Sequence, residues 1–211
     1  MILTRREYLA GMAAMGGVAA CRAAAPQAGA NGPRPDLYQC EGCEGVFERP
    51  SASLPARIVM AKGERGTPLD VEGRVLKPDG VTPAPGVVLY VYHTNADGLY
   101  ANGSGESEWS RRHGRIRGWL KTGADGRYAI RTIKPAPYPS QPFPAHLHFT
   151  VLEPGRKPYY IDDIVFDGET GVTADHRARQ EFRGGSGIVR LARGSGGVPL
   201  ARRDIILERH P

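Results

Sequence analysis

The chain has little cysteine and no long apolar run. Only three of its 211 residues are cysteine, so no second pair exists for a four-cysteine zinc site. No run reaches the roughly 18 consecutive apolar residues of a membrane-spanning helix, which excludes a multipass membrane protein. The 28 glycines show no three-residue period, which excludes collagen, and no propeller or solenoid repeat occurs. The length suits one globular domain.

The chain is basic, with a net charge of +6. Most of the excess is arginine scattered along the sequence, which attracts anions without specifying nucleic acid. The densest run contains Arg111, Arg112, Arg115 and Arg117. Tyrosine and phenylalanine are not interleaved there as stacking platforms. We therefore predict a solvated loop or strand edge, and no nucleic-acid partner.

Residues 1–20 have the layout of a twin-arginine export signal. Arg5 and Arg6 precede a mildly apolar run of alanine, glycine, methionine and valine. Residues 18–21 resemble the lipobox of bacterial lipoproteins, in which Cys21 is lipidated and attaches the chain to a membrane. Cleavage among residues 23–25 would instead release the protein. Both alternatives place it outside the cytoplasm, as a periplasmic, membrane-anchored or secreted protein.

Residues 21–36 are rich in alanine, proline and glycine and are predicted to be a flexible tether, which leaves 37–211 as the folded domain. Cys40 and Cys43 follow the tether as a C-x-x-C pair. Such a pair serves as a redox motif, half of a zinc site or a local disulfide, and no βαβ pattern supports a thioredoxin-like unit. In an oxidising compartment we prefer the disulfide, with free thiols second.

Short strand patterns fill the rest of the chain. Leu69, Val71 and Val75 alternate with polar residues at the period of a half-buried strand. Further strands are expected at 87–93, 116–121, 127–133, 146–153, 188–192 and 204–207. Only 174–182 looks helical, with Thr173 as its N-cap. The sequence therefore predicts an all-β protein, an antiparallel β-sandwich with long loops and at most one or two short helices.

The most informative segment contains His146 and His148. Residues two apart on a strand share a face, so both imidazoles point the same way while Leu147 and Phe149 enter the opposite, apolar face. Two imidazoles in this arrangement can bind one metal ion. The same spacing also occurs in cupins, in zinc sites and on ordinary protein surfaces, so it does not identify the metal.

Two tyrosines are candidates to join these histidines. Tyr138 lies on a stiff arm, because five prolines fall within residues 134–144. The arm returns to His146 after eight residues, so Tyr138 is placed to meet the two histidines; its alternative role is to pack on the core. Tyr100 follows the turn at 95–99 and, by residue type alone, is a packed turn residue.

The order and spacing of several segments resemble those of the intradiol ring-cleavage dioxygenases, the family of protocatechuate and catechol dioxygenases. The resemblance runs from about Leu69 to Leu207. It rests on residues 71–75 (VEGRV), 95–100 (NADGLY), 125–128 (DGRY), 131–139 (RTIKPAPYP) and 144–149 (PAHLHF).

This resemblance implies a β-sandwich that holds a non-haem ferric ion, Fe(III), through two tyrosinates and two histidines. Tyr100 matches the tyrosine that stays bound, and Tyr138 matches the one that leaves and takes a proton from the substrate, a small aromatic diol that reacts with O2. His146 and His148 match the paired histidines. A phenol has a pKa near 10, so a tyrosinate at neutral pH needs a strong Lewis acid beside it.

Two positions depart from the family pattern and are candidates for the substrate pocket. An arginine is expected three residues before the first histidine, where Phe143 stands, and Asp163 stands where a glutamine is usual. The lost cation could be supplied by Arg115, Arg117 or Arg156. Alternatively, Phe143 stacks on a less polar aromatic ring.

Two other functions fit the same residues. A noncatalytic, transthyretin-like β-sandwich would bind ligands outside the cytoplasm. Alternatively, His146, His148 and Asp163 would form a ferrous facial triad. The other histidines have no partner at ligand spacing and are expected to be surface or structural residues: His93, His113, His176 and His210.

Overall fold

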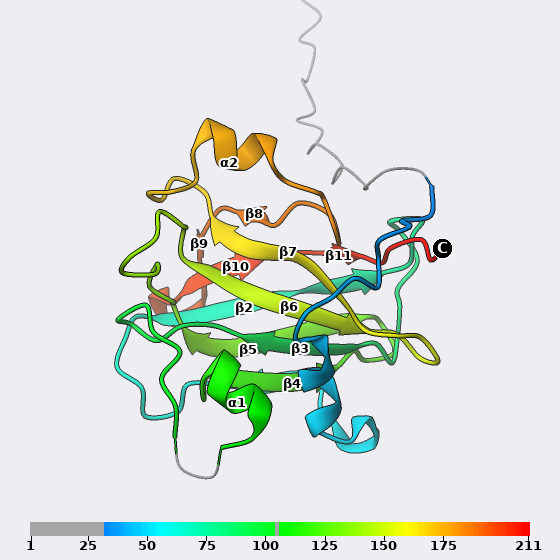
Figure 1. Cartoon of the computed structure of the whole chain (residues 1–211), viewed down its shortest axis with the longest axis horizontal. Coiled ribbons are helices and arrows are strands. Elements are labelled where there is room, and N and C mark those ends of the chain that lie inside the picture. The colour runs from blue at the N-terminus through cyan, green and yellow to red at the C-terminus, as the bar shows by residue number, and fades with distance from the viewer. Residues whose placement is uncertain (1–31, 104–105) are drawn as a thin grey trace, which may run out of the picture.

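The computed structural model describes residues 32–103 and 106–211. The predicted export signal at 1–20 and Cys21 lie outside these residues, as does most of the predicted tether. Two β-sheets face each other, and the two α-helices lie at opposite edges of this sandwich (Figure 1). Within the described residues, every helix is too short or too polar to cross a membrane.

The first sheet has six strands in the order β1-β5-β2-β10-β9, and β11 also pairs with β2. Its strands are β1 (Arg57–Val59), β2 (Pro68–Leu76), β5 (Arg127–Ile133), β9 (Ala192–Arg193), β10 (Pro199–Arg202) and β11 (Ile205–Ile206). The second sheet has five strands in the order β4-β3-β6-β7-β8. They are β3 (Val88–Tyr92), β4 (Arg117–Lys121), β6 (His146–Leu152), β7 (Tyr159–Phe166) and β8 (Ile188–Val189).

Helix is scarce in the described part of the chain. The α-helices are α1 (Glu108–His113) and α2 (Ala174–Ala178), and the 3-10 helices are η1 (Cys43–Glu48), η2 (Ser51–Ser53) and η3 (Ser195–Gly197). Helix α2 begins after the predicted cap, since the Thr173 side chain accepts a hydrogen bond from the backbone of His176. Helix α1 was not predicted. It takes in Arg111 and Arg112, which the sequence placed in a loop or strand edge.

The predicted all-β sandwich is confirmed, although both sheets are mixed rather than purely antiparallel. The central pairs β2–β5, β3–β4, β3–β6 and β6–β7 are antiparallel. The pairs β1–β5, β2–β10, β2–β11 and β7–β8 are parallel. Strands β1, β7 and β10 lie outside the predicted ranges. Parallel pairing joins segments far apart in the chain, so local alternation does not reveal it.

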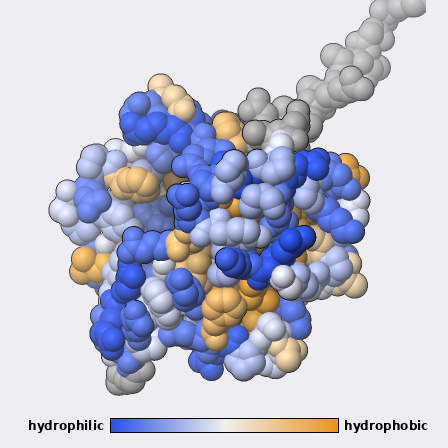
Figure 2. Space-filling model, turned by 45° about the vertical axis from the view of Figure 1, so that its right-hand side comes forward, coloured by the Kyte–Doolittle hydropathy of each residue, from blue (hydrophilic) through white to orange (hydrophobic). Residues whose placement is uncertain are grey.

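The hydrophobic core lies between the sheets. Leu69 and Val71 of β2 are fully buried, and so are Leu147 and Phe149 of β6. Burying one such side chain stabilises the fold by roughly 1.5 to 3 kcal/mol. The face of the molecule in Figure 2 is mostly hydrophilic and is interrupted by separate apolar patches. Because Leu147 and Phe149 of β6 enter the core, His146 and His148 lie on the other side of that strand.

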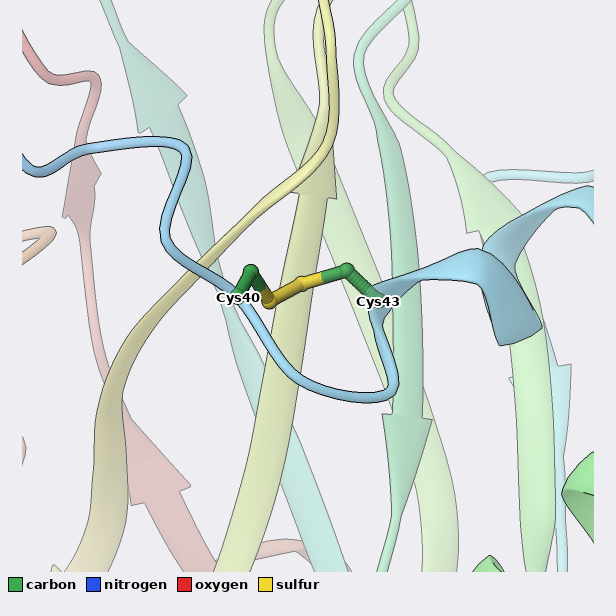
Figure 3. Close-up of a disulfide and its surroundings, with 2 residues drawn as sticks. All are labelled: Cys40 and Cys43. Atoms are coloured by element: carbon green, nitrogen blue, oxygen red, sulfur yellow. A yellow bond between two sulfur atoms is a disulfide. The ribbon is translucent and has the colours of Figure 1, made fainter.

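The N-terminal segment is tied to the sandwich. Cys40 and Cys43 form a disulfide immediately before η1 (Figure 3), and η1 packs against β3 and β6. Contacts with the rest of the domain begin by Arg34, within the predicted tether, because its Nε donates to Glu208 at 2.9 Å. The disulfide thus closes a tight turn beside β3 and β6, two interior strands of the second sheet.

His93 is a structural residue of the interior rather than a surface one. It is 1% exposed. Its Nδ1 donates to the carbonyl of Thr94 and its Nε2 accepts from the hydroxyl of Thr132, both at 2.7 Å. Burial lowers the pKa of His93 from 6.5 to about 4. The folded protein therefore holds His93 neutral.

We predict that this histidine makes the fold sensitive to acid. Its contribution to the free energy of unfolding is fully present above pH 6.5, where both states are neutral. It falls as the pH drops toward about 4, because the unfolded state binds the proton first. The loss is on the order of 3 kcal/mol. Denaturant unfolding at several pH values measures it. His93→Gln, which does not titrate, should weaken the pH dependence; an unchanged slope would contradict the assignment.

Candidate metal centre

Strand β6 presents His146 and His148 on the face directed away from the core between the sheets. His146 is 3% exposed. Its Nδ1 donates to the carbonyl of Pro144 at 2.7 Å, and Nδ1 of His148 donates to Oδ1 of Asp163 at 2.9 Å. Carbonyl and carboxylate oxygens accept hydrogen bonds, so each Nδ1 carries the ring proton. Each Nε2 then carries a lone pair, and the two Nε2 atoms lie 3.0 Å apart.

Tyr100 and Tyr138 bring their hydroxyls to the same point. The two hydroxyl oxygens are 2.6 Å apart. The oxygen of Tyr100 lies 2.8 Å from Nε2 of His148, and that of Tyr138 lies 3.0 Å from Nε2 of His146. The structure thus brings together all four residues that the sequence nominated as metal ligands.

The protons available do not satisfy these contacts. Two phenolic protons can form only two of the hydrogen bonds among the two oxygens and the two Nε2 atoms. The remaining close approaches place lone pairs against lone pairs. A cation bound among the four atoms removes this repulsion, and a set of hard oxygens with imidazole suits a ferric ion. The residues present therefore fit the metal.

The turn at 95–99 is fixed against the proline arm, which brings the tyrosines together. The hydroxyl of Thr94 donates to the carbonyl of Ala136, and the Ala136 amide donates to the carbonyl of Asn95. Gly98 has a φ of +76°, and a Cβ at that position would lie 2.0 Å from the carbonyl oxygen of Pro137. Only glycine permits this approach.

Burial of the site keeps the phenols neutral when no cation is present. It raises the pKa of Tyr100, and the hydrogen bond to Tyr138 raises it further. It also raises the pKa of Tyr138. Burial and the neighbouring His148 lower the pKa of His146. The lowered pKa favours a neutral His146 that can act as a ligand, whereas the phenols need a Lewis acid to ionise.

Asp163 reaches His148 because β7 is irregular at this position. Leu147 pairs with Ile164 and Phe149 pairs with Ile161, so two β7 residues oppose the single residue His148. Such a bulge re-aims side chains. Burial alone would raise the pKa of Asp163, but the interaction with the adjacent His148 outweighs it and lowers that pKa. Asp163 therefore carries a carboxylate that orients the His148 ring.

This geometry does not favour the ferrous facial triad. Ligand atoms of His146, His148 and Asp163 do lie within 4.8 Å of one another. However, His148 turns Nδ1 toward Asp163 and Nε2 toward the tyrosines and His146. The carboxylate is therefore placed to support the ligand histidine from behind.

Phe143 and the three arginines proposed to replace the missing cation occupy different regions. The ring of Phe143 lies edge-on to His146, with centroids 5.1 Å apart. Arg115 pairs with Glu64, and Arg117 pairs with Glu48. Arg156 lies in the turn that follows β6, at the opposite end of the strand from His146. The hypothesis that one of these arginines supplies the cation is not supported.

Sequence reasoning missed the aromatic support behind His148. Tyr92 of β3 pairs with His148 in the sheet and stacks on it, with ring centroids 4.5 Å apart. His113 also stacks on Tyr92, with ring centroids 4.0 Å apart, and is buried. The strand predicted at 87–93 already included Tyr92. Its register against β6, which no local pattern reveals, puts it beside the histidine.

A family model described as Dioxygenase matches residues 45–183, more than half of the chain. The chain belongs to the intradiol dioxygenase family. It is 34% identical to 6-chlorohydroxyquinol 1,2-dioxygenase of Cupriavidus pinatubonensis over 143 residues, which cover 55% of this chain and 50% of the relative. The chain spans about half the length, or less, of the first curated relatives it matches.

Solved structures of this family share the fold. Catechol 1,2-dioxygenase from Acinetobacter sp. ADP1 superposes with a TM-score of 0.57 at 23% identity, over 75% of this chain and 59% of the other. The dioxygenase domain of a dioxygenase carbohydrate-binding protein fusion from Streptomyces sp. SirexAA-E gives a TM-score of 0.56 at 24% identity. That match covers 79% of this chain and 95% of the other. Intradiol dioxygenases use non-haem Fe(III).

We predict that Asp163→Asn weakens iron binding by roughly 10- to 100-fold, the usual effect of losing a partner of a ligand histidine. The asparagine side chain is nearly the same size as that of aspartate, but it lacks the negative charge that holds the Nδ1 proton of His148. Competition with a chelator of known affinity measures the change. Asp162→Asn is the matched control on the same strand, because its carboxylate instead accepts from the backbone amide of Phe182. Equal iron affinity in wild type and Asp163→Asn would contradict the assigned role.

Proposed function

We propose that the protein is a non-haem ferric dioxygenase that cleaves a catechol-type aromatic ring between its two hydroxylated carbons. In this proposal Tyr100, Tyr138, His146 and His148 hold the ion, and the substrates are a small aromatic diol and O2. The observation that carries the proposal is the convergence of two phenolic oxygens and two imidazole Nε2 atoms around one point.

The bound ferric ion would supply the Lewis acidity that ionises the phenols and draws electron density from a bound diol. The protein's own contribution begins with orientation. Hydrogen bonds from Nδ1 of both histidines, to Pro144 and to Asp163, hold the Nε2 lone pairs on one point. Preorganised ligands of this kind do not have to rearrange during reaction.

Tyr138 is placed to act as the general base. It lines a cavity that neither His146 nor His148 lines, and its hydroxyl contacts Nε2 of His146. A diol that enters from this cavity meets Tyr138 before it meets His146 or His148. The oxygen of Tyr138, once ionised, is therefore the atom that accepts a proton from the diol. Tyr100 comes from the separate turn at 95–99 and does not line this cavity.

The net reaction conserves all atoms of both substrates. One carbon–carbon bond of the diol breaks, both oxygen atoms of O2 enter the product, and each former hydroxyl-bearing carbon becomes a carboxyl carbon. The ring carbons are oxidised and O2 is reduced. Use of 18O2 followed by mass spectrometry would show two labelled atoms in the ring-opened product.

We predict that Tyr138→Phe retains iron and lowers turnover of catechol by about 100- to 10,000-fold, the range for loss of a general base. Oxygen uptake measures the rate, and iron content is checked in the same sample. Tyr160→Phe is the matched control, since Tyr160 lines the same cavity and has no place among the four proposed ligands. Unchanged oxygen uptake in Tyr138→Phe rules the base role out.

A further inference from the structure

A cavity of about 820 Å³ adjoins the proposed metal centre. Its walls come from the proline arm, from β7 and from the segment that contains α2. Its lining residues include Tyr138, Phe143, Asp163 and His176. Cavities of roughly 300 to 1,000 Å³ enclose ligands of drug size. The space is therefore larger than a single six-membered ring requires.

Phe143 forms an apolar wall beside the metal centre. It is 43% exposed and is one of the few exposed large hydrophobic side chains in the described residues. Its ring lies edge-on to His146 at 5.1 Å and edge-on to His176 at 6.1 Å, and 6.3 Å from the ring of Tyr138. A second aromatic ring in the cavity would cover this exposed surface.

The charge of the cavity opposes an anionic substrate. The carboxylates of Asp162, Asp163, Asp175 and Glu181 line it. Arg179 is the one arginine among its described lining residues, and its guanidinium pairs with Asp175 one helical turn away. Glu181 is paired with Arg183, so a carboxylate on the substrate would face mainly the like charge of Asp162 and Asp163, which costs binding energy.

We propose that the substrate is an uncharged catechol that carries a further aromatic ring, and that Phe143 determines this specificity. The inference rests on the proposed function, because the diol end of the molecule would occupy the centre formed by the tyrosines and histidines. The second ring would lie in the cavity against Phe143, on the side of His176.

Three ligands test the proposal by anaerobic titration of the iron-loaded protein, with the dissociation constant read from the visible spectrum and from calorimetry. They are catechol, its phenyl-substituted form 3,4-dihydroxybiphenyl, and its carboxylated form 3,4-dihydroxybenzoate. In the wild type the biphenyl should bind at least about 10-fold tighter than catechol, because it buries a second ring. The benzoate should bind at least about 10-fold more weakly than catechol.

Variants at position 143 then assign the effect to one residue. Phe143→Arg should tighten binding of the benzoate and weaken binding of the biphenyl, which reverses their order. Phe143→Leu keeps an apolar wall, so the biphenyl should still bind more tightly than the benzoate, with a smaller difference between their dissociation constants. Unchanged preferences in Phe143→Arg would overturn the role of Phe143.

The wild-type titration also separates this proposal from the function on which it rests. If catechol shifts the spectrum but the biphenyl binds no tighter, the substrate class is wrong and the dioxygenase function stands. If the benzoate binds as well as catechol, the charge argument is wrong. If no diol changes the spectrum of the iron-loaded protein, the proposed function itself fails.

Discussion

Two phenolic oxygens and two imidazole nitrogens lie within hydrogen-bonding distance of one another and have too few protons to satisfy their contacts. Every other feature of the site depends on this crowding. Nδ1 of each histidine is already committed to an oxygen acceptor, so neither ring can offer its proton to the cluster. Burial also disfavours phenolate in the absence of a cation. A single ion of high charge resolves both problems.

Features of the backbone bring these four side chains together. Alternation on β6 sends Leu147 and Phe149 into the core and so commits the two histidines to the other face. The close approach at Gly98 joins the Tyr100 turn to the Tyr138 arm. The bulge in β7 brings a carboxylate behind His148, and Gly187 permits β8 to approach the backbone of Asp163. Rigid elements thus position a site whose substrate side is open.

The sequence predicted the sandwich and nominated all four converging residues, since H-x-H and a proline arm are local patterns and the family resemblance supplied Tyr100. It did not predict β7, where adjacent aspartates interrupt the alternation at the bulge. Nor did it predict α1, which spans under two turns. The partners of Asp163 and Tyr92 depend on strand register, which is a long-range property. The sequence could not place the arginines proposed as substitute cations, since the ion pairs of Arg115 with Glu64 and of Arg117 with Glu48 join distant segments.

The most direct test of the central claim is the iron content and visible spectrum of the iron-reconstituted protein, compared with Tyr100→Phe. We expect one iron per chain and a tyrosinate-to-iron charge-transfer band, which shifts and weakens when Tyr100 is replaced. A protein that binds no iron, or that binds iron without this band in both forms, would contradict it.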